Sequence, residues 1–221
     1  MPPSLRHAWT AIIQPADYEA HMAANGQAQA NADLARELFL VAPPPPGAAI
    51  LFAGAGTGQM FDYLDPGILA PYRTTLTDIN PDFLDSLEAR LEPYELAFET
   101  LVDDIERPSV PGYFDLLIAV LLLEHVDWPT AVAALCRLAT WRVFVVIQED
   151  PPNLESRPAV GTMNVLRELH PRLVDRAELV RAFEKHGFRV HRISSREVAD
   201  SKKMVAIEFV RDRPPVVTPP R

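Results

Sequence analysis

The chain has 221 residues and a formal net charge of −9, from 21 basic and 30 acidic side chains. This length suits one large domain with a single core, which buries roughly 70% of the surface that the unfolded chain exposes. The negative charge argues against binding of long nucleic acid through neutralised phosphates, without excluding a local basic patch.

Cysteine and histidine usage narrows the class of protein further. Cys136 is the one cysteine; it cannot form an internal disulfide, and its helical pattern VAALCRL indicates a small core residue. The six histidines show no metal-ligand spacing, so we expect no metal site. Residues 1–15 lack the apolar core of a signal peptide, and no stretch is long and apolar enough for a membrane span. We therefore expect a cytoplasmic protein without a membrane partner.

Two helical patterns lie between residues 15 and 41. In the first pattern, Pro15 suits the first turn of a helix and Gly26 suits its end. The second pattern has leucines at helical spacing, namely Leu34, Leu38 and Leu40. We expect these helices to form an amphipathic N-terminal cap.

A proline tract, APPPPGA at residues 42–48, follows the two helical patterns. Consecutive prolines favour polyproline II and prevent helix formation, so this tract is predicted to be an extended spacer. Three parts are expected along the chain: the cap and spacer over residues 1–46, a main domain over residues 47–212, and a disordered, proline-rich tail over residues 213–221.

Residues 48–64, AAILFAGAGTGQMFDYL, combine an apolar run, a glycine-rich turn and the predicted start of an amphipathic helix. The run at 50–53 is typical of a buried strand in a parallel sheet. Gly54, Gly56 and Gly58 lack a Cβ, so a ligand can lie directly on the main chain. The unpaired amides of the next helix would favour a carboxylate or a phosphate. The alternative is a turn that merely packs a helix on the sheet.

The rest of the chain alternates between predicted strands and helices. Further strands are expected at residues 74–77, before Asp103-Asp104-Ile105, at 116–121 and at 141–150. Helices are expected from Pro81, from Trp128, and between Asp175 and Gly187. The β-rich runs 188–198 and 203–212, separated by ADSK, predict a hairpin that closes the sheet.

The glycine spacing distinguishes two kinds of nucleotide cradle. A dinucleotide-binding fingerprint requires glycine where Gln59 stands. ILFAGAGTG at 50–58 instead resembles the first motif of class I S-adenosylmethionine-dependent methyltransferases. LLLEHVDWP at 121–129, after a strand that begins with Phe-Asp, resembles the fourth motif of the small-molecule type of that family.

The resemblance covers about two thirds of the chain and implies a fold and a reaction. The implied fold is α/β: a Rossmann-like, doubly wound, seven-stranded, mostly parallel sheet with one antiparallel strand, and a helical cap at the N-terminus. The implied cofactor is S-adenosyl-L-methionine, whose methyl group would pass to an O, N or C nucleophile of a small molecule. The sequence identifies neither this acceptor nor the oligomeric state.

The resemblance also places the cofactor along the tips of the first four strands. Asp78 would accept hydrogen bonds from the ribose hydroxyls, with a helix N-cap as the alternative role. Asp104, rather than Asp103, would accept from the adenine amino group, with a solvated turn as the alternative. The implied cofactor-binding residues are Ala53, Gly54, Gly56, Gly58, Asp78, Ile79, Asp104, Ile105, Ala119, Val120, Tyr18 and His21. Tyr18 and His21 could equally be ordinary residues of a surface helix.

Glu124 and His125 stand at the mouth of the implied site. Either could act as a general base, because imidazole titrates near neutrality and burial raises the pKa of a carboxyl group. Both could instead orient the loop or cap the next helix. Residues implied to line the substrate site are Met163, Asn164, Arg167 and His170.

Phe52 is a departure from the family pattern. Family members commonly carry an acidic residue two positions before the first glycine, where it helps to hold the cofactor's amino group. Two other functions therefore stay open: a non-catalytic S-adenosylmethionine-binding or regulatory module of the same fold, and a nucleotide-dependent reductase, which Gln59 and the closing hairpin oppose.

Overall fold

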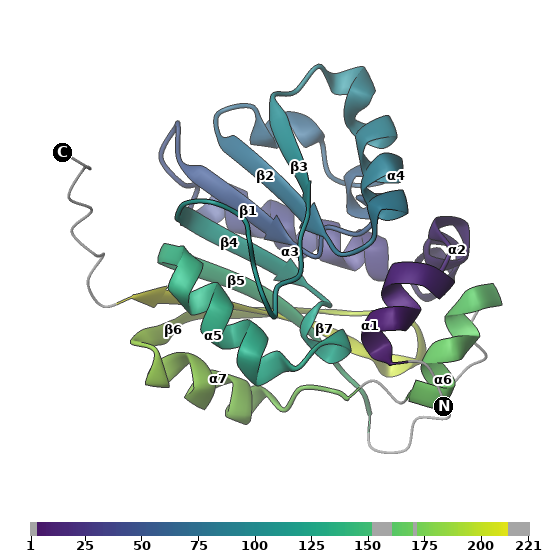
Figure 1. The fold of residues 1–221 in the computed structure, drawn as a ribbon. Helices are drawn as coiled ribbons and strands as arrows, with labels where there is room; N and C mark the ends of the chain where they lie inside the picture. Colours follow the sequence, from purple (N-terminus) through teal and green to yellow (C-terminus); the bar gives the residue numbers. More distant parts are fainter. Residues whose placement is uncertain (1–3, 152–160, 170–171, 212–221) are drawn as a thin grey trace.

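A seven-stranded sheet is the centre of the protein in the computed structural model, which describes residues 4–151, 161–169 and 172–211. The strands are β1 (Ala49–Ala53), β2 (Arg73–Asp78), β3 (Phe98–Val102), β4 (Phe114–Val120), β5 (Ala139–Glu149), β6 (Phe188–Glu197) and β7 (Lys203–Arg211). Their order in the sheet is β3-β2-β1-β4-β5-β7-β6 (Figure 1).

The sheet is mostly parallel. Neighbouring strands from β3 to β5 all pair in parallel, whereas β7 pairs antiparallel with both β5 and β6. The predicted hairpin is confirmed, since β6 and β7 are joined by a short turn around Ala199–Ser201. This topology is that of the class I methyltransferase fold expected from the sequence.

Helices cover both faces of the sheet. Figure 1 shows α5 and α7 in front of the sheet and α3 behind it, with α1, α2 and α6 together at one end. The helices are α1 (Leu5–His7), α2 (Pro15–Asn25), α3 (Gln27–Val41), α4 (Pro81–Leu91), α5 (Trp128–Leu138), α6 (Val165–Leu169) and α7 (Arg176–Lys185). The predicted caps of α7 are confirmed, because Asp175 accepts from the Glu178 amide at 2.8 Å and Gly187 has a φ of +78°.

Alternate residues of each central strand face two different cores. In β1, Leu51 faces the core beneath α5 and α7, whereas Ile50 and Phe52 face the core beneath α3 and α4. All five residues of β1 are buried, as a parallel strand covered on both faces requires. Cys136 is 2% exposed in the first core, as predicted.

The helix expected directly after the glycine turn is absent from this described segment. The chain forms two short 3₁₀ helices instead, Gln59–Asp62 and Pro66–Leu69. Pro66 disfavours helical dihedrals at the preceding residue, and Asp65 accordingly has φ −54° and ψ 113°. The glycine turn therefore does not lead into the N-terminus of an α-helix, and the anion-binding argument based on such a helix is wrong.

The helix α3 packs directly on the sheet. Leu34 and Leu38 are fully buried there, as expected, but Leu40 is 70% exposed. Residues two apart lie on opposite sides of a helix, so Phe39 rather than Leu40 joins the core. The helix α2 covers the carboxyl ends of the strands, whereas α3 belongs to the layer behind the sheet. The expected boundary between the N-terminal cap and the main domain at residue 47 stays a prediction.

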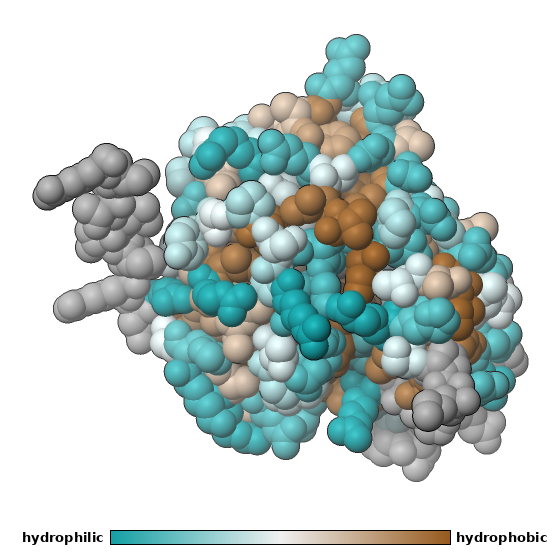
Figure 2. Space-filling model, in the orientation of Figure 1, coloured by the Kyte–Doolittle hydropathy of each residue, from teal (hydrophilic) through white to brown (hydrophobic). Residues whose placement is uncertain are grey.

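Hydrophilic side chains cover most of the face shown in Figure 2, and apolar side chains gather near its middle. Val102 and Tyr113 are among the large apolar residues that are more than half exposed. Within the described residues, no helix has the length and apolarity needed to cross a bilayer.

Candidate active site

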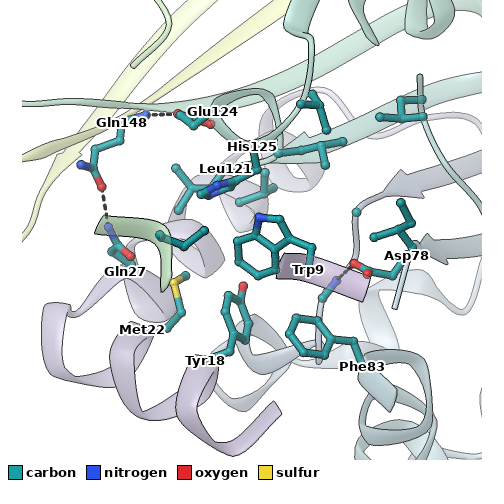
Figure 3. Close-up of a pocket in the computed structure, with 18 of the residues that line it drawn as sticks. Trp9, Tyr18, Met22, Gln27, Asp78, Phe83, Leu121, Glu124, His125 and Gln148 are labelled. Carbon is teal, nitrogen blue, oxygen red and sulfur yellow. Dashed lines mark hydrogen bonds between the residues drawn. The ribbon is translucent and has the colours of Figure 1, made fainter. Parts of the chain in front are cut away.

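A cavity of about 340 Å³ lies beyond the carboxyl ends of the parallel strands, where open α/β sheets bind their ligands. The tips of β1, β2, β4 and β5 form its floor, and α2 with the segment before it closes the opposite side (Figure 3). Its volume falls within the range of small-molecule sites.

The first two glycines of the turn present bare main chain to this cavity. Gly54 and Gly56 line the cavity and have φ values of +64° and +60°. A Cβ on Gly56 would lie 3.3 Å from the Tyr18 hydroxyl oxygen, and one on Gly54 would lie 2.7 Å from Cδ1 of Leu122. A side chain at either position would therefore press on a residue that lines the cavity.

Gly58 has a different role from the other two glycines. It does not line the cavity, and a Cβ on it would lie 2.1 Å from Cδ1 of Leu87, a fully buried residue of α4. The packing interpretation of the glycine turn thus fits Gly58, whereas the cradle interpretation fits Gly54 and Gly56.

Asp78 ties the glycine turn to the tip of β2. Its carboxylate accepts from the amides of Gly56 and Asn80, each at 2.9 Å, and its side chain lines the cavity. Burial raises the pKa of Asp78, while these amides act in the opposite direction. The N-cap of α4 is Asn80, which accepts from the Asp82 amide at 3.0 Å, so Asp78 is free of that alternative role.

The two aspartates after β3 serve different partners. Asp103 accepts from the amide and the hydroxyl of Ser109 at 2.7 and 2.8 Å. Asp104 accepts from the Glu106 amide at 3.0 Å and forms an ion pair with Arg6. Asp103 therefore stabilises its own loop through Ser109, whereas Asp104 pairs with a side chain of the N-terminal segment.

A second cluster of polar side chains, linked by hydrogen bonds, lies at the tips of β4 and β5. Oε1 of Glu124 accepts from the Gln148 amide at 2.8 Å, and burial raises the pKa of Glu124 to about 7. The Gln148 side chain accepts from Nε2 of Gln27 at 2.7 Å (Figure 3). It also donates to Asp150 at 2.6 Å. Oε2 of Glu124 has no hydrogen-bond partner among the described residues.

His125 stands beside Glu124 as a half-buried, neutral imidazole. Burial lowers its pKa to about 4, and the charge of His21 acts in the same direction. The ring lies 4.7 Å from the Trp9 indole, and its Nδ1 has no partner among the described residues. The neighbouring residue Leu121 has a φ of +51°, a strained conformation for a branched side chain at the cavity wall.

Aromatic residues form the wall opposite the sheet. The ring of Trp9 lies 6.0 Å from that of Tyr18 and 6.1 Å from that of Phe83, edge to face in both cases (Figure 3). The Trp9 carbonyl accepts from Nδ2 of Asn80 at 2.9 Å, while its indole Nε1 has no partner within the described part of the chain. Burial raises the pKa of the Tyr18 hydroxyl, which therefore stays protonated.

Most of the residues singled out in the sequence meet at this cavity. It is lined by Tyr18, His21, Gly54, Gly56, Asp78, Ile79, Asp104, Ile105, Val120, Glu124, His125 and Met163. Ala53, Gly58 and Ala119 are buried beside it without lining it, and Asn164 and Arg167 are exposed. His170 lies outside the described residues.

Trp9 and Phe83 are the main lining residues that the sequence did not indicate. Phe83 was hidden in a helical pattern that suits an ordinary core residue. Trp9 follows a serine cap at Ser4, and with the buried residues Ala8 and Ile13 it forms an apolar N-terminal pattern that could have indicated packing. Nothing in that pattern indicates what the segment packs against.

Phe52 stands where members of the resembled family commonly carry an acidic residue. Its side chain is 4% exposed and packs in the core beneath α3, 6.1 Å from the ring of Phe61. This position therefore contributes an apolar core residue and no carboxylate.

Residues 50–141 match a family model described as a methyltransferase domain. The magnesium protoporphyrin IX methyltransferase ChlM from Synechocystis PCC 6803, crystallised with SAM, is 16% identical over 85% of this chain and 80% of that chain, with a TM-score of 0.66. The N-methyltransferase NodS from Bradyrhizobium japonicum WM9, in complex with S-adenosyl-L-homocysteine, is 14% identical over 83% and 86%, with a TM-score of 0.62. The [4+2]-cyclase SpnF is 12% identical over 81% and 80%, with a TM-score of 0.63.

These structural likenesses show the fold, and comparison with curated proteins found no match. The sheet order of this chain is that of the class I methyltransferase fold. The match to the methyltransferase-domain model covers the central strands, residues 50–141, which are less than half of the chain.

Proposed function

We propose that the protein transfers a methyl group from S-adenosyl-L-methionine to an O, N or C nucleophile of a small molecule, which binds in the cavity beyond the sheet. The observation that carries this proposal is the meeting of Gly54, Gly56, Asp78 and Asp104 around one cavity. These residues come from three separate segments, and apart from the bond between the Gly56 amide and Asp78, no described hydrogen bond joins them.

The half of the cavity near β2 and β3 suits an adenosine. Each oxygen of Asp78 keeps a free lone pair after accepting from one amide, so the carboxylate can also accept from two ribose hydroxyls. Ile79 and Ile105 offer apolar surface for a base, and Asp104 offers an acceptor for its amino group. The bare main chain at Gly56 allows the close approach that this arrangement requires.

The methionine end would lie over Gly54 and the tip of β4. Because Phe52 supplies no carboxylate, main-chain carbonyls near Ala53 and Ala119 are the proposed partners of the ammonium group. A weaker ammonium subsite is expected than in a site with an acidic residue at this position.

The chemistry that the cofactor supplies is a methyl group on a positively charged sulfur, which a nucleophile attacks in line. The protein's own part is to position the acceptor and to exclude water with Trp9, Tyr18 and Leu122. Glu124 and His125 are proposed as the groups that take a proton where the acceptor must lose one.

A second candidate is a binding or regulatory module that does not turn over. The filled ammonium position at Phe52 favours it, and the [4+2]-cyclase with the same fold illustrates that the fold alone does not determine the reaction. A nucleotide-dependent reductase is disfavoured, because Gln59 stands where a dinucleotide fingerprint requires glycine.

Calorimetric titration with S-adenosylmethionine, S-adenosylhomocysteine and NAD tests the proposal. We expect both adenosyl compounds to bind and NAD to show no saturable heat. Binding of NAD in place of the adenosyl compounds would overturn the proposal. Tight binding without product formation for any acceptor would favour the non-catalytic module.

A further inference from the structure

The cavity carries an excess of negative charge. Its described lining residues include six carboxylic acids and two basic side chains. The acids are Asp78, Asp103, Asp104, Glu106, Glu124 and Asp150, and the bases are Arg6 and Lys202. Arg6 is paired with Asp104, so its charge is already balanced. An anionic ligand would therefore be repelled and a cationic ligand favoured.

The two ends of the cavity use their acids differently. Near β2 and β3, Asp78 and Asp103 accept main-chain amide hydrogens, and Asp104 is paired. At the tips of β4 and β5, Glu124 keeps one carboxylate oxygen without a described partner, although its residue is only 6% exposed. A buried oxygen of this kind is costly unless a donor reaches it.

The position of Glu124 is fixed by its surroundings. Oε1 is held by the Gln148 amide, and the Gln148 side chain is in turn held between Gln27 and Asp150. These contacts hold the Glu124 carboxylate in one orientation, with Oε2 buried beside the cavity that the residue lines. The groups that face this end are Asp150 from the end of β5, His21 from α2, Lys202 from the loop before β7, and His125.

Across from Glu124 stand the rings of Trp9 and Tyr18 (Figure 3). Aromatic faces attract a cation electrostatically, indole most strongly. His125 is uncharged over the neutral pH range because burial lowers its pKa to about 4, so it does not repel a positive ligand. Aromatic groups and an unpaired carboxylate thus bound the same space beside the tip of β4.

We propose that the methyl acceptor is an amine that enters this space as an ammonium ion, and that Oε2 of Glu124 receives its proton. The proposal rests on the methyltransferase function proposed above. The ammonium N–H bond breaks and its proton passes to Glu124, leaving a neutral amine with a free electron pair. That pair forms the new N–C bond while the C–S bond breaks and its electrons stay on sulfur. The products are a methylammonium ion and a neutral thioether, and Glu124 returns its proton to solvent.

Other acceptor classes fit less well. A carboxylic acid would bring a negative charge beside Glu124 and Asp150, and a phenolate would need a cation that this end lacks beyond Lys202. The pKa of Glu124, raised to about 7 by burial, agrees with proton transfer from an ammonium ion near neutral pH.

Three probes of similar size, each with one benzene ring, test the proposal: 2-phenylethylamine, 4-ethylphenol and 3-phenylpropanoate. Each is titrated into the full-length protein saturated with S-adenosylhomocysteine. We expect the amine to bind about tenfold or more tighter than the other two probes. In Glu124→Gln, the amine should lose about tenfold in affinity, while S-adenosylhomocysteine should bind within about twofold of the parent. Glu149→Gln is the matched control, because Glu149 is a neighbouring carboxylate that pairs with Arg176 outside the cavity.

Methyl transfer to the same probes gives the second readout. We expect the amine to be methylated and kcat for Glu124→Gln to lose the rise with pH that the parent shows as Glu124 ionises. Equal or better binding of the phenol or the carboxylate, or an amine affinity that Glu124→Gln leaves unchanged, would overturn the proposal. Failure of S-adenosylhomocysteine to bind at all would instead overturn the proposed function, so the two failures are distinguishable.

Discussion

The two ends of the cavity differ in how completely their polar groups are satisfied. Around β2 and β3, main-chain amides hydrogen-bond Asp78 and Asp103, and Arg6 neutralises Asp104. Around β4 and β5, Glu124 and His125 each keep a buried polar atom without a described partner. The first end is thus organised before any ligand binds, whereas the second end has groups that a ligand could complete.

This difference separates binding from chemistry. A preorganised end can hold the invariant part of a cofactor at little cost in ordering, because its side chains are already fixed. At an end with unsatisfied polar groups, an acceptor that supplies their missing hydrogen bonds is favoured over one that does not. Mutations at the two ends should therefore change different measured quantities.

The largest effect is expected within the glycine turn itself. Gly58→Val should destabilise the fold by about 2 to 5 kcal/mol, because a left-handed residue gains a Cβ and the added atoms meet Leu87. Gly56→Ala should instead weaken cofactor binding, since its Cβ would enter the cavity beside Tyr18. Urea unfolding and calorimetric titration measure the two quantities. A Gly58→Val variant that loses cofactor affinity while its stability is unchanged would contradict the different roles given to the two glycines.

The next effect concerns the pH dependence of stability. Between pH 4.5 and 7 the folded state holds a proton on Glu124 that the unfolded state releases, so this group's contribution falls as pH rises through that range. Glu124→Gln removes this loss and should gain stability relative to the parent, by up to about 3 kcal/mol at pH 7. His125 has a pKa lowered to about 4, so its contribution to stability rises as pH rises from 4 to 6.5. This contribution is present in both the parent and Glu124→Gln, and it cancels in the difference between them.

Urea unfolding of the parent and of Glu124→Gln across this pH range measures the difference directly. Glu149→Gln is again the control, because its side chain is 34% exposed and lies outside the cavity. A constant stability difference between parent and Glu124→Gln at all pH values would show that Glu124 has an ordinary pKa.

Asp78→Ala tests the preorganised end. It should weaken S-adenosylmethionine by about 1 to 3 kcal/mol, through loss of charge-assisted bonds to the ribose and of the acceptor that holds the Gly56 amide. Asp103→Ala is the control, because that carboxylate serves Ser109. Unchanged affinity in Asp78→Ala, measured by calorimetry, would remove the ribose role.

The smallest effect is expected at the Arg6–Asp104 ion pair. The Arg6 side chain is 53% exposed, and ion pairs of this kind contribute no more than about 1 kcal/mol. If Arg6 competes with adenine for Asp104, Arg6→Ala should tighten S-adenosylhomocysteine by up to about fivefold. Arg107→Ala is the control, because Arg107 is an exposed arginine in the loop that carries Asp104. A weaker affinity in Arg6→Ala would mean that Arg6 contacts the cofactor instead.

Local patterns in the sequence were sufficient to predict the sheet. Apolar runs such as residues 116–121 and the turn at ADSK depend on burial and on backbone geometry, both of which neighbouring residues determine. The same patterns placed Asp78 and Asp104 at strand tips, and in a parallel sheet these tips meet at one edge. The family resemblance supplied the interpretation of that edge as a cofactor site.

Other features depended on long-range packing and could not be read locally. Ala119 and Val120 are adjacent in one strand, yet alternation turns Ala119 into the core beneath α5 and leaves Val120 at the cavity. Trp9 reaches the site only because the N-terminal segment folds back over α4, where Asn80 holds its carbonyl. The amphipathic helix predicted after the glycine turn is missing because Pro66 disfavours helical dihedrals at Asp65.

A crystal structure with bound S-adenosylhomocysteine tests the central claim most directly. We predict that the adenosine lies over the bare main chain of Gly56, with its ribose hydroxyls on Asp78 and its base beside Asp104. The sulfur of S-adenosylhomocysteine should face Glu124 and Trp9. A nucleoside bound elsewhere, or a cavity that Trp9 and Leu122 close against the ligand, would contradict it.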